Sequence, residues 1–243
     1  MTTIAENYAH VQQRIEAAAA RAERPSSAIT LIAVTKTWPV EVLVEAYAAG
    51  MRHFGENRTH ELAQKRPYFH THLPDNTIIW HQIGTLQSRQ TNDAAAHADV
   101  FHALDRLKIA RRLSPQVVEN GRVLPTFLEI NISGEGSKSG FNMSDWETSA
   151  TQRADLRKAV TEIAGLPGLT ICGLMTMAPW DVPEDIIRTV FRRTRQLAHW
   201  LQDEFPDQNF RQLSMGMTDD FEIAIEEGTT HIRVGRAIFG SRH

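Results

Sequence analysis

The chain has 243 residues, of which 42% are hydrophobic and 23% are charged, and its formal net charge is −3. This length is sufficient for one large domain and suits an α/β barrel. The near balance of 26 basic and 29 acidic residues argues against nucleic acid or an anionic membrane as a partner. The first 25 residues carry no apolar segment typical of a signal peptide or membrane anchor, so we expect a cytoplasmic protein. The single cysteine, Cys172, lies in an apolar stretch and is expected to be a buried thiol.

The predicted elements begin with an amphipathic helix within residues 1–25, where apolar residues recur at three- and four-residue spacings before Pro25. We expect it to cover a larger body. Apolar strands and helices then alternate up to residue 240. The predicted strands cover residues 29–35, 51–54, 77–83, 100–103, 125–132, 170–176, 212–214 and 231–234. The predicted helices cover residues 40–49, 58–66, 86–98, 106–119, 144–165, 183–205 and 219–227, and residues 67–76 and 133–140 are predicted loops.

Eight strands that alternate with helices predict a closed (β/α)8 barrel of the TIM type, in one domain with an extra N-terminal helix. An open doubly wound sheet is the alternative, and the absence of a GxGxxG motif after the first strand weighs against it. The first predicted loop holds His70 and His72, whose spacing could suit a metal. No cluster of Cys, Asp or Glu accompanies them, so we predict no metal site.

Lys36 is the first candidate functional residue, because it ends the apolar run ITLIAVTKTWP at residues 29–39. Burial at a strand end lowers the pKa of a lysine, and a partly neutral lysine can form a Schiff base. The alternative is a rim charge whose ammonium reaches solvent. Of the other lysines, Lys65, Lys108 and Lys158 adjoin arginines on helices expected to be solvated. Lys138 lies in the second predicted loop and could act as a second anchor or a gate.

Polar residues follow most of the predicted strands, and in a barrel the carboxyl ends of the strands form the active rim. Each residue alone has a structural explanation, such as a helix cap or a methionine that fills the core. Their coincidence at one rim predicts a binding site. The residues are Lys36, Glu56, Asn57, His81, Gln82, Gln87, Asn131, Glu135, Lys138, Met175, Met177, Ser214, Met215, Gly216, Arg233 and Gly235.

The last two strands are where barrels commonly bind phosphate, through backbone N–H groups at a helix start together with a hydroxyl. Ser214 and Gly216 follow the seventh strand, and Gly235 and Arg236 open the final short helix. A phosphorylated ligand that reacts with an amine would satisfy both ends of this rim. Pyridoxal 5′-phosphate (PLP) has both groups, with its aldehyde on Lys36 and its phosphate between the two loops.

Several segments resemble the pyridoxal-phosphate homeostasis proteins, single-domain relatives of the alanine racemase barrel. They are VTKTWP, HFGENRTHEL around Asn57, WHQIGTLQSRQ, EINISGEGSKSGF, GLMTMAP and LSMGMTDDFEIAIEEGTTHIRVGRAIFGSR. The resemblance spans nearly the whole chain. Two departures are Ser88-Arg89-Gln90, where family members often have Asn-Lys, and Thr218, where a serine is usual.

The resemblance implies a role for each of six residues. Lys36 would be the Schiff-base lysine and Arg233 the partner of the pyridine nitrogen. The phosphate would be contacted chiefly through the backbone by Ser214, Gly216, Gly235 and Arg236. We add His81, Lys138 and Met215 as further candidates.

The resemblance also implies a cytosolic carrier of the cofactor that holds PLP and releases it to apo-enzymes. An arginine that faces the pyridine nitrogen leaves that nitrogen neutral, so the ring is a weak electron sink. A racemase further needs acid and base groups on both faces. Racemase relatives take the second group, a tyrosine, from a C-terminal β-domain, which we expect this chain to lack. Its tyrosines, Tyr8, Tyr47 and Tyr68, fall in predicted helices or a distant loop.

Two enzymatic alternatives remain open at this point. One is a PLP-dependent amino-acid racemase in which His81 or a water supplies the missing proton. The other is an aldolase-type barrel that forms a Schiff base with a sugar phosphate. Because the β-domain through which racemases pair is absent from the expected architecture, we expect a monomer.

Overall fold

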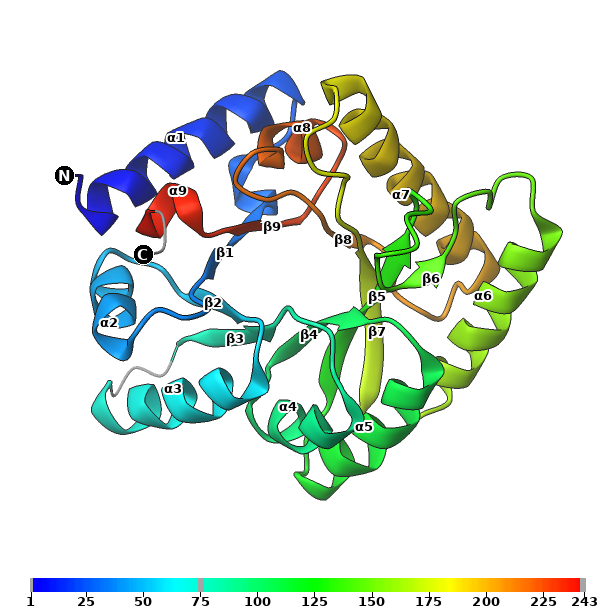
Figure 1. Ribbon diagram of the computed structural model, residues 1–243, viewed down its shortest axis with the longest axis horizontal. Coiled ribbons are helices and arrows are strands. Elements are labelled where there is room, and N and C mark those ends of the chain that lie inside the picture. The colour runs from blue at the N-terminus through cyan, green and yellow to red at the C-terminus, as the bar shows by residue number, and fades with distance from the viewer. Residues whose placement is uncertain (1, 74–76, 241–243) are drawn as a thin grey trace.

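The computed structural model describes residues 2–73 and 77–240, and its centre is a closed parallel barrel (Figure 1). Neighbouring strands pair in the order β4-β3-β2-β1-β9-β8-β7-β5, and a further pairing between β4 and β5 closes the ring. This confirms the predicted barrel. The strands are β1 (Thr30–Val34), β2 (His53–Glu56), β3 (Ile79–Gln82), β4 (Val100–Leu104), β5 (Leu124–Asn131), β7 (Leu169–Met175), β8 (Gln212–Ser214) and β9 (His231–Val234).

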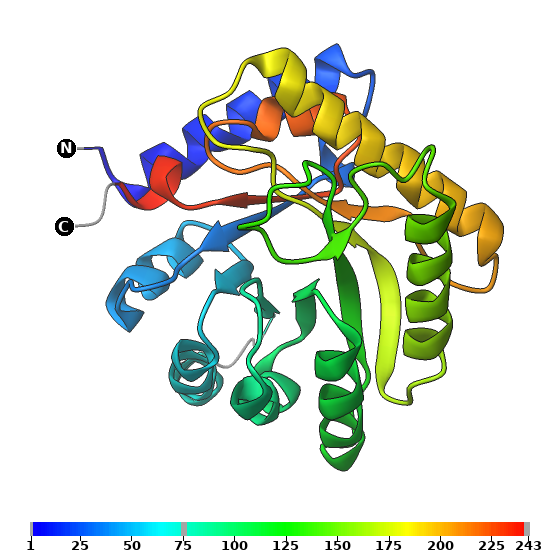
Figure 2. The same cartoon turned by 45° about the vertical axis from the view of Figure 1, so that its right-hand side comes forward.

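The helices form a ring around the barrel (Figures 1 and 2). Helix α1 (Ile4–Arg21) packs against α8 and α9 and buries Val11, Ile15 and Ala18. Its first turn is closed by a capping box between Thr3 and Glu6, which satisfies two backbone N–H groups. The others are α2 (Val40–Ala48), α3 (Thr59–His72), α4 (Thr91–His97), α5 (Leu107–Glu119), α6 (Ala150–Ala164), α7 (Glu184–Glu204), α8 (Phe221–Glu226) and α9 (Arg236–Phe239), with single 3-10 turns η1 (Ser26–Ala28) and η2 (Ser88–Gln90).

The prediction of a loop at residues 67–76 was wrong, because α3 continues through Pro67 to His72. A proline inside a helix removes one backbone hydrogen bond. Here packing compensates, since the buried Phe69 ring lies 6.1 Å from Phe54 and 5.6 Å from Trp80 between centroids. Residues 74–76 of that predicted loop lie outside the described residues.

The predicted start of the helix at residues 144–165 was also wrong. Helix α6 begins at Ala150, and the side chain of Ser149 caps it by accepting a hydrogen bond from the N–H of Gln152 at 3.2 Å. The preceding residues include a two-residue strand, β6 (Phe141–Asn142), which pairs with the end of β5. The loop at residues 133–140 therefore returns to the barrel wall, as Figure 2 shows at the carboxyl end of β5.

The interior of the barrel is unusually polar, where branched apolar residues are the rule. Histidines from four strands, a buried arginine and a buried glutamate lie among the core residues. They are His53, His81, His102, His231, Arg233 and Glu129. The prediction for Cys172 is confirmed, because this residue is buried on β7. Burial raises the pKa of its thiol.

The described residues show neither a membrane-spanning helix nor a cluster of metal ligands. None of their helices is long and apolar enough to cross a membrane. No group of three or more His, Cys, Asp or Glu side chains among them is arranged to hold a metal ion, and His70 and His72 both lie on α3.

Candidate functional site

Lys36 lies in the turn that follows β1, and its side chain is half-buried. Thr35, before it, is fully buried, and Thr37, after it, has a φ of 68°. A positive φ is uncommon for a β-branched residue, so the surrounding contacts must hold the turn in place. The backbone N–H of Thr37 donates to Glu61 at 2.6 Å, and the hydroxyl of Thr35 donates to Glu56 at 2.6 Å.

A buried ion cluster of Glu56, Glu61 and Lys65 supplies these contacts. The Nζ of Lys65 lies 2.8 Å from Glu56 Oε1 and 3.1 Å from Glu61 Oε2, and it also donates to the carbonyl of Thr35 at 3.0 Å. The side chain of Lys65 is only 6% exposed. The assignment of Lys65 to a solvated helix face was therefore wrong. Its ammonium contacts the turn that carries Lys36, through the carbonyl of Thr35.

The pKa values of the two carboxyl groups in this cluster are shifted in opposite directions. Burial raises the pKa of Glu56 to about 7, although Lys65 and Thr35 act to lower it. Burial also acts to raise the pKa of Glu61, but the N–H of Thr37 and the ammonium of Lys65 outweigh it and lower the value. Glu61 is thus the anionic partner near neutral pH, and Glu56 is poised to bind a proton.

Arg233, on β9, is buried at the same end of the barrel. Its Nη1 donates to the Ser214 carbonyl at 2.7 Å and to the Ser214 hydroxyl at 2.6 Å, and its Nη2 donates to the Thr176 carbonyl at 3.0 Å. Burial lowers its pKa to about 10, so it remains a cation at neutral pH. A guanidinium has five N–H donors, so these three bonds leave donor capacity for a ligand.

Glu129, on β5, is one of the buried acidic groups near Arg233. It is 2% exposed, and its Oε2 has no hydrogen-bond partner within the described part of the chain. Burial raises its pKa to about 7, the nearby Asp105 adds to the rise, and Arg233 opposes it. An orphaned oxygen of this kind is expected where a ligand supplies the partner.

Ser214 and His81 lie deeper than the sequence suggested. The Ser214 side chain is fully buried, and its hydroxyl contacts His102 as well as Arg233, so it faces the barrel interior and not the rim. His81 is 1% exposed and lies between His53 and His102. Burial lowers the pKa of His81 well below its ordinary value. Ser214 therefore supports Arg233 with its hydroxyl, and His81 belongs to the inner wall.

The two loops predicted to hold a phosphate have glycines for identifiable reasons. Gly216 has a φ of 96°, and a Cβ there would lie 2.6 Å from the Cβ of Ala224 on α8. Gly235 precedes α9 and lies against Val34. A Cβ added at Gly235 would lie 3.4 Å from the Cβ of Val34. The N–H groups at the start of a helix lack partners within the helix, so α9 presents donors beside the end of β1.

The Arg236 side chain points along the surface instead of toward this backbone. It pairs with Asp219, and its guanidinium lies over the exposed ring of Trp180, 5.4 Å from the centroid. Any contact of Arg236 with an anion at the start of α9 would therefore come from its backbone N–H. Met215, the remaining candidate of this segment, is fully buried, and its N–H donates to the His231 carbonyl at 3.1 Å.

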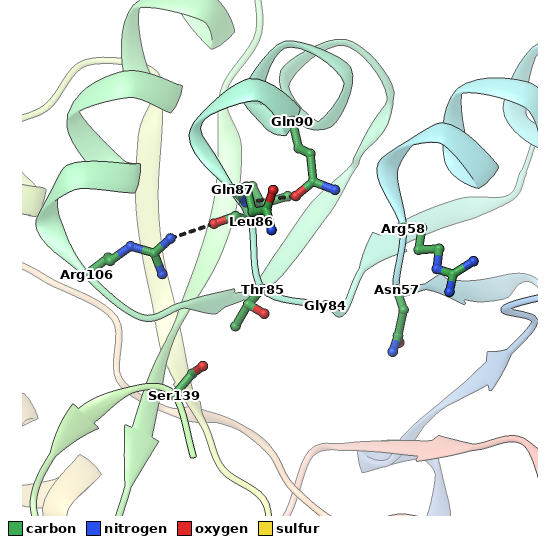
Figure 3. A pocket seen from close by; sticks show the side chains of 9 residues that line it. All are labelled: Asn57, Arg58, Gly84, Thr85, Leu86, Gln87, Gln90, Arg106 and Ser139. Atoms are coloured by element: carbon green, nitrogen blue, oxygen red, sulfur yellow. Dashed lines mark hydrogen bonds between the residues drawn. The ribbon is translucent and has the colours of Figure 1, made fainter. Parts of the chain in front are cut away.

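A cavity of about 350 Å³ opens at the carboxyl ends of β2, β3 and β4. Its lining is Asn57, Arg58, Gly84, Thr85, Leu86, Gln87, Gln90, Arg106 and Ser139 (Figure 3). Of the predicted rim residues, Asn57 and Gln87 line this cavity, whereas Lys36 and Arg233 do not. Figure 3 shows Arg106 donating to the Leu86 carbonyl, which fixes one wall.

Lys138 reaches the rim from the loop at residues 133–140. Its Nζ donates to Ser133 at 3.1 Å, to Glu135 at 2.5 Å and to the Met177 carbonyl at 3.2 Å. The ammonium therefore ties the loop after β5 to the segment after β7.

Sequence reasoning missed two parts of the site, and each left a signal. Glu61, Leu62, Lys65 and Phe69 share one face of α3, and the two apolar residues mark that face as buried. Lys65 could therefore have been placed inward. The inner histidines lie one on each of four short strands, where the pleat can point a side chain into the barrel, but nothing in the sequence pairs them across strands.

The residues present fit the two ends of a PLP molecule. A buried arginine with spare donors suits a ring nitrogen that accepts a hydrogen bond, and the start of α9 offers backbone donors to a phosphate. The orphaned Oε2 of Glu129 marks a buried polar position between the barrel core and the rim. Lys36 extends from the adjacent strand end.

Comparisons with known proteins identify the family and the fold. The family model described as "Alanine racemase, N-terminal domain" matches residues 6–243. Curated pyridoxal phosphate homeostasis proteins from Vibrio cholerae and Escherichia coli K12 are each 40% identical, covering 100% of this chain and 98% of their own. Among solved structures, PipY of Synechococcus elongatus with PLP bound has a TM-score of 0.82 at 35% identity, over 98% of this chain and 100% of its own. An alanine racemase from Clostridium difficile, at 13% identity, has a TM-score of 0.69 over 95% of this chain and 55% of its own, and shares the fold alone.

Proposed function

This chain belongs to the pyridoxal phosphate homeostasis proteins of the alanine racemase N-terminal domain family, and from that membership we propose that it binds PLP and holds it without robust catalysis. Lys36 is the anchor in this proposal. Its amine condenses with the aldehyde of PLP, which forms a C=N bond and releases water, and the reverse reaction frees the cofactor. The PipY structure with PLP bound supports the choice of ligand.

The observation that carries the proposal is the arrangement of Lys36 and Arg233 at one end of the barrel, with the backbone at Gly235 and Arg236 beside them. The buried ion cluster fixes the turn of Lys36 from both sides. Arg233 is held by three hydrogen bonds and has N–H donors left for the ring nitrogen. Asn57, on the wall of the neighbouring cavity, completes the proposed set.

The same geometry argues against strong catalysis at the α-carbon of an amino acid. An arginine cannot accept a proton, so a ring nitrogen that faces Arg233 stays neutral and withdraws electrons weakly. His81, considered above as a second acid or base, is buried between two other histidines. Delivery of the cofactor to apo-enzymes, a monomeric state and a cytoplasmic location are the remaining parts of the proposal.

The test is the absorbance spectrum of the purified protein incubated with PLP, before and after borohydride reduction. We expect a band for lysine-bound cofactor that borohydride removes, with mass spectrometry locating the modification on Lys36. The variant Lys36→Ala should lose the band, and Lys158→Ala, on the exposed face of α6, should keep it. A band that survives Lys36→Ala at full strength contradicts the anchor, and a modification found on Lys138 moves it.

The racemase remains the alternative, supported by the family model's description. Exchange of the α-hydrogen of an amino acid in deuterated water, lost in Lys36→Ala, would favour it. The third hypothesis is an aldolase-type barrel. If borohydride traps a sugar phosphate on the protein, and not PLP, this hypothesis replaces both the PLP-binding protein and the racemase.

A further inference from the structure

A continuous row of hydrogen-bonding side chains crosses the interior of the barrel. His53 Nδ1 lies 3.0 Å from His81 Nε2, and His81 Nδ1 lies 2.9 Å from His102 Nε2. His102 Nδ1 lies 2.8 Å from the hydroxyl of Ser214, which in turn accepts from Arg233 at 2.6 Å. We call His53, His81, His102 and Ser214 the histidine relay. It begins at the first residue of β2, at the amino end of that strand, and ends inside the barrel at Ser214, the last residue of β8, where it meets Arg233.

The two contacts of the Ser214 hydroxyl indicate the direction of every hydrogen bond in the relay. An arginine only donates, so the Ser214 oxygen accepts from Arg233, and in the described part of the chain His102 Nδ1 is the one acceptor in contact with the Ser214 hydroxyl for its hydrogen. His102 then carries its proton on Nε2 and donates to His81 Nδ1. By the same rule His81 donates from Nε2 to His53 Nδ1. The hydrogen bonds assign all three rings to the Nε2–H form.

The outer end of the relay faces a second cavity. His53 is half-buried and lines a cavity of about 210 Å³ at the amino ends of β1 and β2, together with Tyr8, Gln12 and Arg52. Arg52 donates to the carbonyls of Tyr47 and Met51, and its guanidinium lies 3.9 Å from the centroid of the Tyr47 ring. His53 is therefore the member of the relay that can exchange a proton with this cavity.

The charged and titratable neighbours of the relay are few. His231 packs against His102, with 6.0 Å between ring centroids, but its own Nδ1 is bonded to Thr230. At the other end, Arg233 faces Glu129 and Asp220 as well as Ser214. Burial lowers the pKa of His53, and more strongly those of His81 and His102. A proton from solvent is thus accommodated most readily on His53.

We propose that the histidine relay positions Arg233 through Ser214 and couples the protonation of His53, in the cavity at the amino ends of the strands, to the binding of the cofactor ring at the opposite end. A proton on His53 Nδ1 would face the Nε2–H of His81. To remove that conflict His81 and His102 must each move their proton from Nε2 to Nδ1, while His53 keeps both of its protons. His102 then donates to Ser214, whose hydrogen loses its acceptor. The coupling to a ligand rests on the proposed function, whereas the directed relay itself does not.

The relay is tested in the ligand-free protein by nitrogen NMR of the histidine rings, which distinguishes the two neutral ring forms. Near pH 7 we expect His81 and His102 to be neutral with the proton on Nε2. In Ser214→Ala, which removes the acceptor of the Arg233 bond and the donor to His102, the His102 preference should be lost. A proton on Nδ1 of either ring in the wild-type protein overturns the relay, whether or not PLP binds.

The coupling is tested by the affinity for PLP between about pH 8 and about pH 5, where a histidine titrates. We expect the affinity of the wild-type protein to fall about tenfold more than that of His53→Gln, as for loss of one hydrogen bond to a charged group. His60→Ala, on the exposed face of α3, is the control and should follow the wild type.

The two tests separate the relay from the function. Equal pH profiles for the wild type and His53→Gln overturn the coupling. Absence of PLP binding in every variant contradicts the proposed function, and with it the coupling, and leaves the NMR result to decide the relay.

Discussion

Replacement of Lys65 by methionine tests whether the buried ion cluster holds the Lys36 turn. The change keeps a long side chain but removes the ammonium that contacts Glu56, Glu61 and the carbonyl of Thr35. Removing one partner of a buried ion pair costs about 3–5 kcal/mol, because the remaining charge is left uncompensated. Glu56 is 0% exposed, so it carries most of that cost.

The proton affinity of Glu56 limits the cost at neutral pH. Its pKa is already about 7 with Lys65 in place, since burial outweighs the ammonium. Without Lys65 the pKa rises further, so the carboxyl of Glu56 is neutral at pH 7 in the folded variant. We therefore expect a loss near the lower figure, about 3 kcal/mol, at pH 7. A carboxyl whose pKa is raised on folding loses stability as pH rises, so the deficit should increase from about pH 6 to about pH 9.

The assay is urea denaturation across that pH range for Lys65→Met, Glu56→Gln and the double variant. Lys158→Met, on a solvent-exposed face, is the matched control and should lie within about 0.5 kcal/mol of the wild type. The double variant should recover part of the loss, because no carboxylate remains beside Thr35. PLP binding should weaken in Lys65→Met and not in Lys158→Met. A deficit under about 0.5 kcal/mol that does not vary with pH would refute this reasoning.

Three further predictions concern the rim and the interior. Gly216→Ala should destabilise the fold by more than about 1 kcal/mol and weaken PLP binding, because the φ of Gly216 is 96° and the new Cβ would lie 2.6 Å from the Cβ of Ala224. Urea denaturation measures the loss of stability, and titration with PLP measures the loss of affinity. The contribution of Glu129 to wild-type stability should fall by up to about 3 kcal/mol as pH rises from 4.5 to about 7, its ordinary and folded pKa values, and in Glu129→Gln that part of the pH dependence should vanish. Arg236→Ala should change the affinity for PLP by less than about threefold, because its side chain pairs with the exposed Asp219 and only its backbone faces the phosphate position; a larger loss would place the guanidinium on the ligand.

Much of the fold could be predicted because each strand and helix has its own local pattern. The apolar run before Lys36 and the alternation that follows it identify the barrel without any knowledge of distant contacts. Pro67 shows the limit of that approach. A local rule ends a helix near a proline, but the contacts of Phe69 with rings on β2 and β3 continue the helix, and these contacts cannot be read from neighbouring residues.

The candidate site divides in the same way. Lys36 and Arg233 could be placed at the rim because strand ends in a barrel converge there. The direction of the Ser214 hydroxyl could not be predicted, since it depends on His102, which lies 112 residues away in the chain. Lys65 was misplaced because its neighbour Arg66 suggested a solvated face, although the apolar residues on the same face of α3 indicate burial; its ion pair with Glu56 at the end of β2 could not be predicted from the sequence.

The buried thiol of Cys172 has a practical consequence. It is the single cysteine in the sequence, it is 6% exposed, and burial raises its pKa, so its thiolate form is scarce near neutral pH. Thiol reagents act on the thiolate. A cysteine introduced at Ser139, which lines the cavity of Figure 3, would therefore be the one position to take up a maleimide dye in the folded protein. Site-specific fluorescence could then follow the loop after β5 while the cofactor enters and leaves.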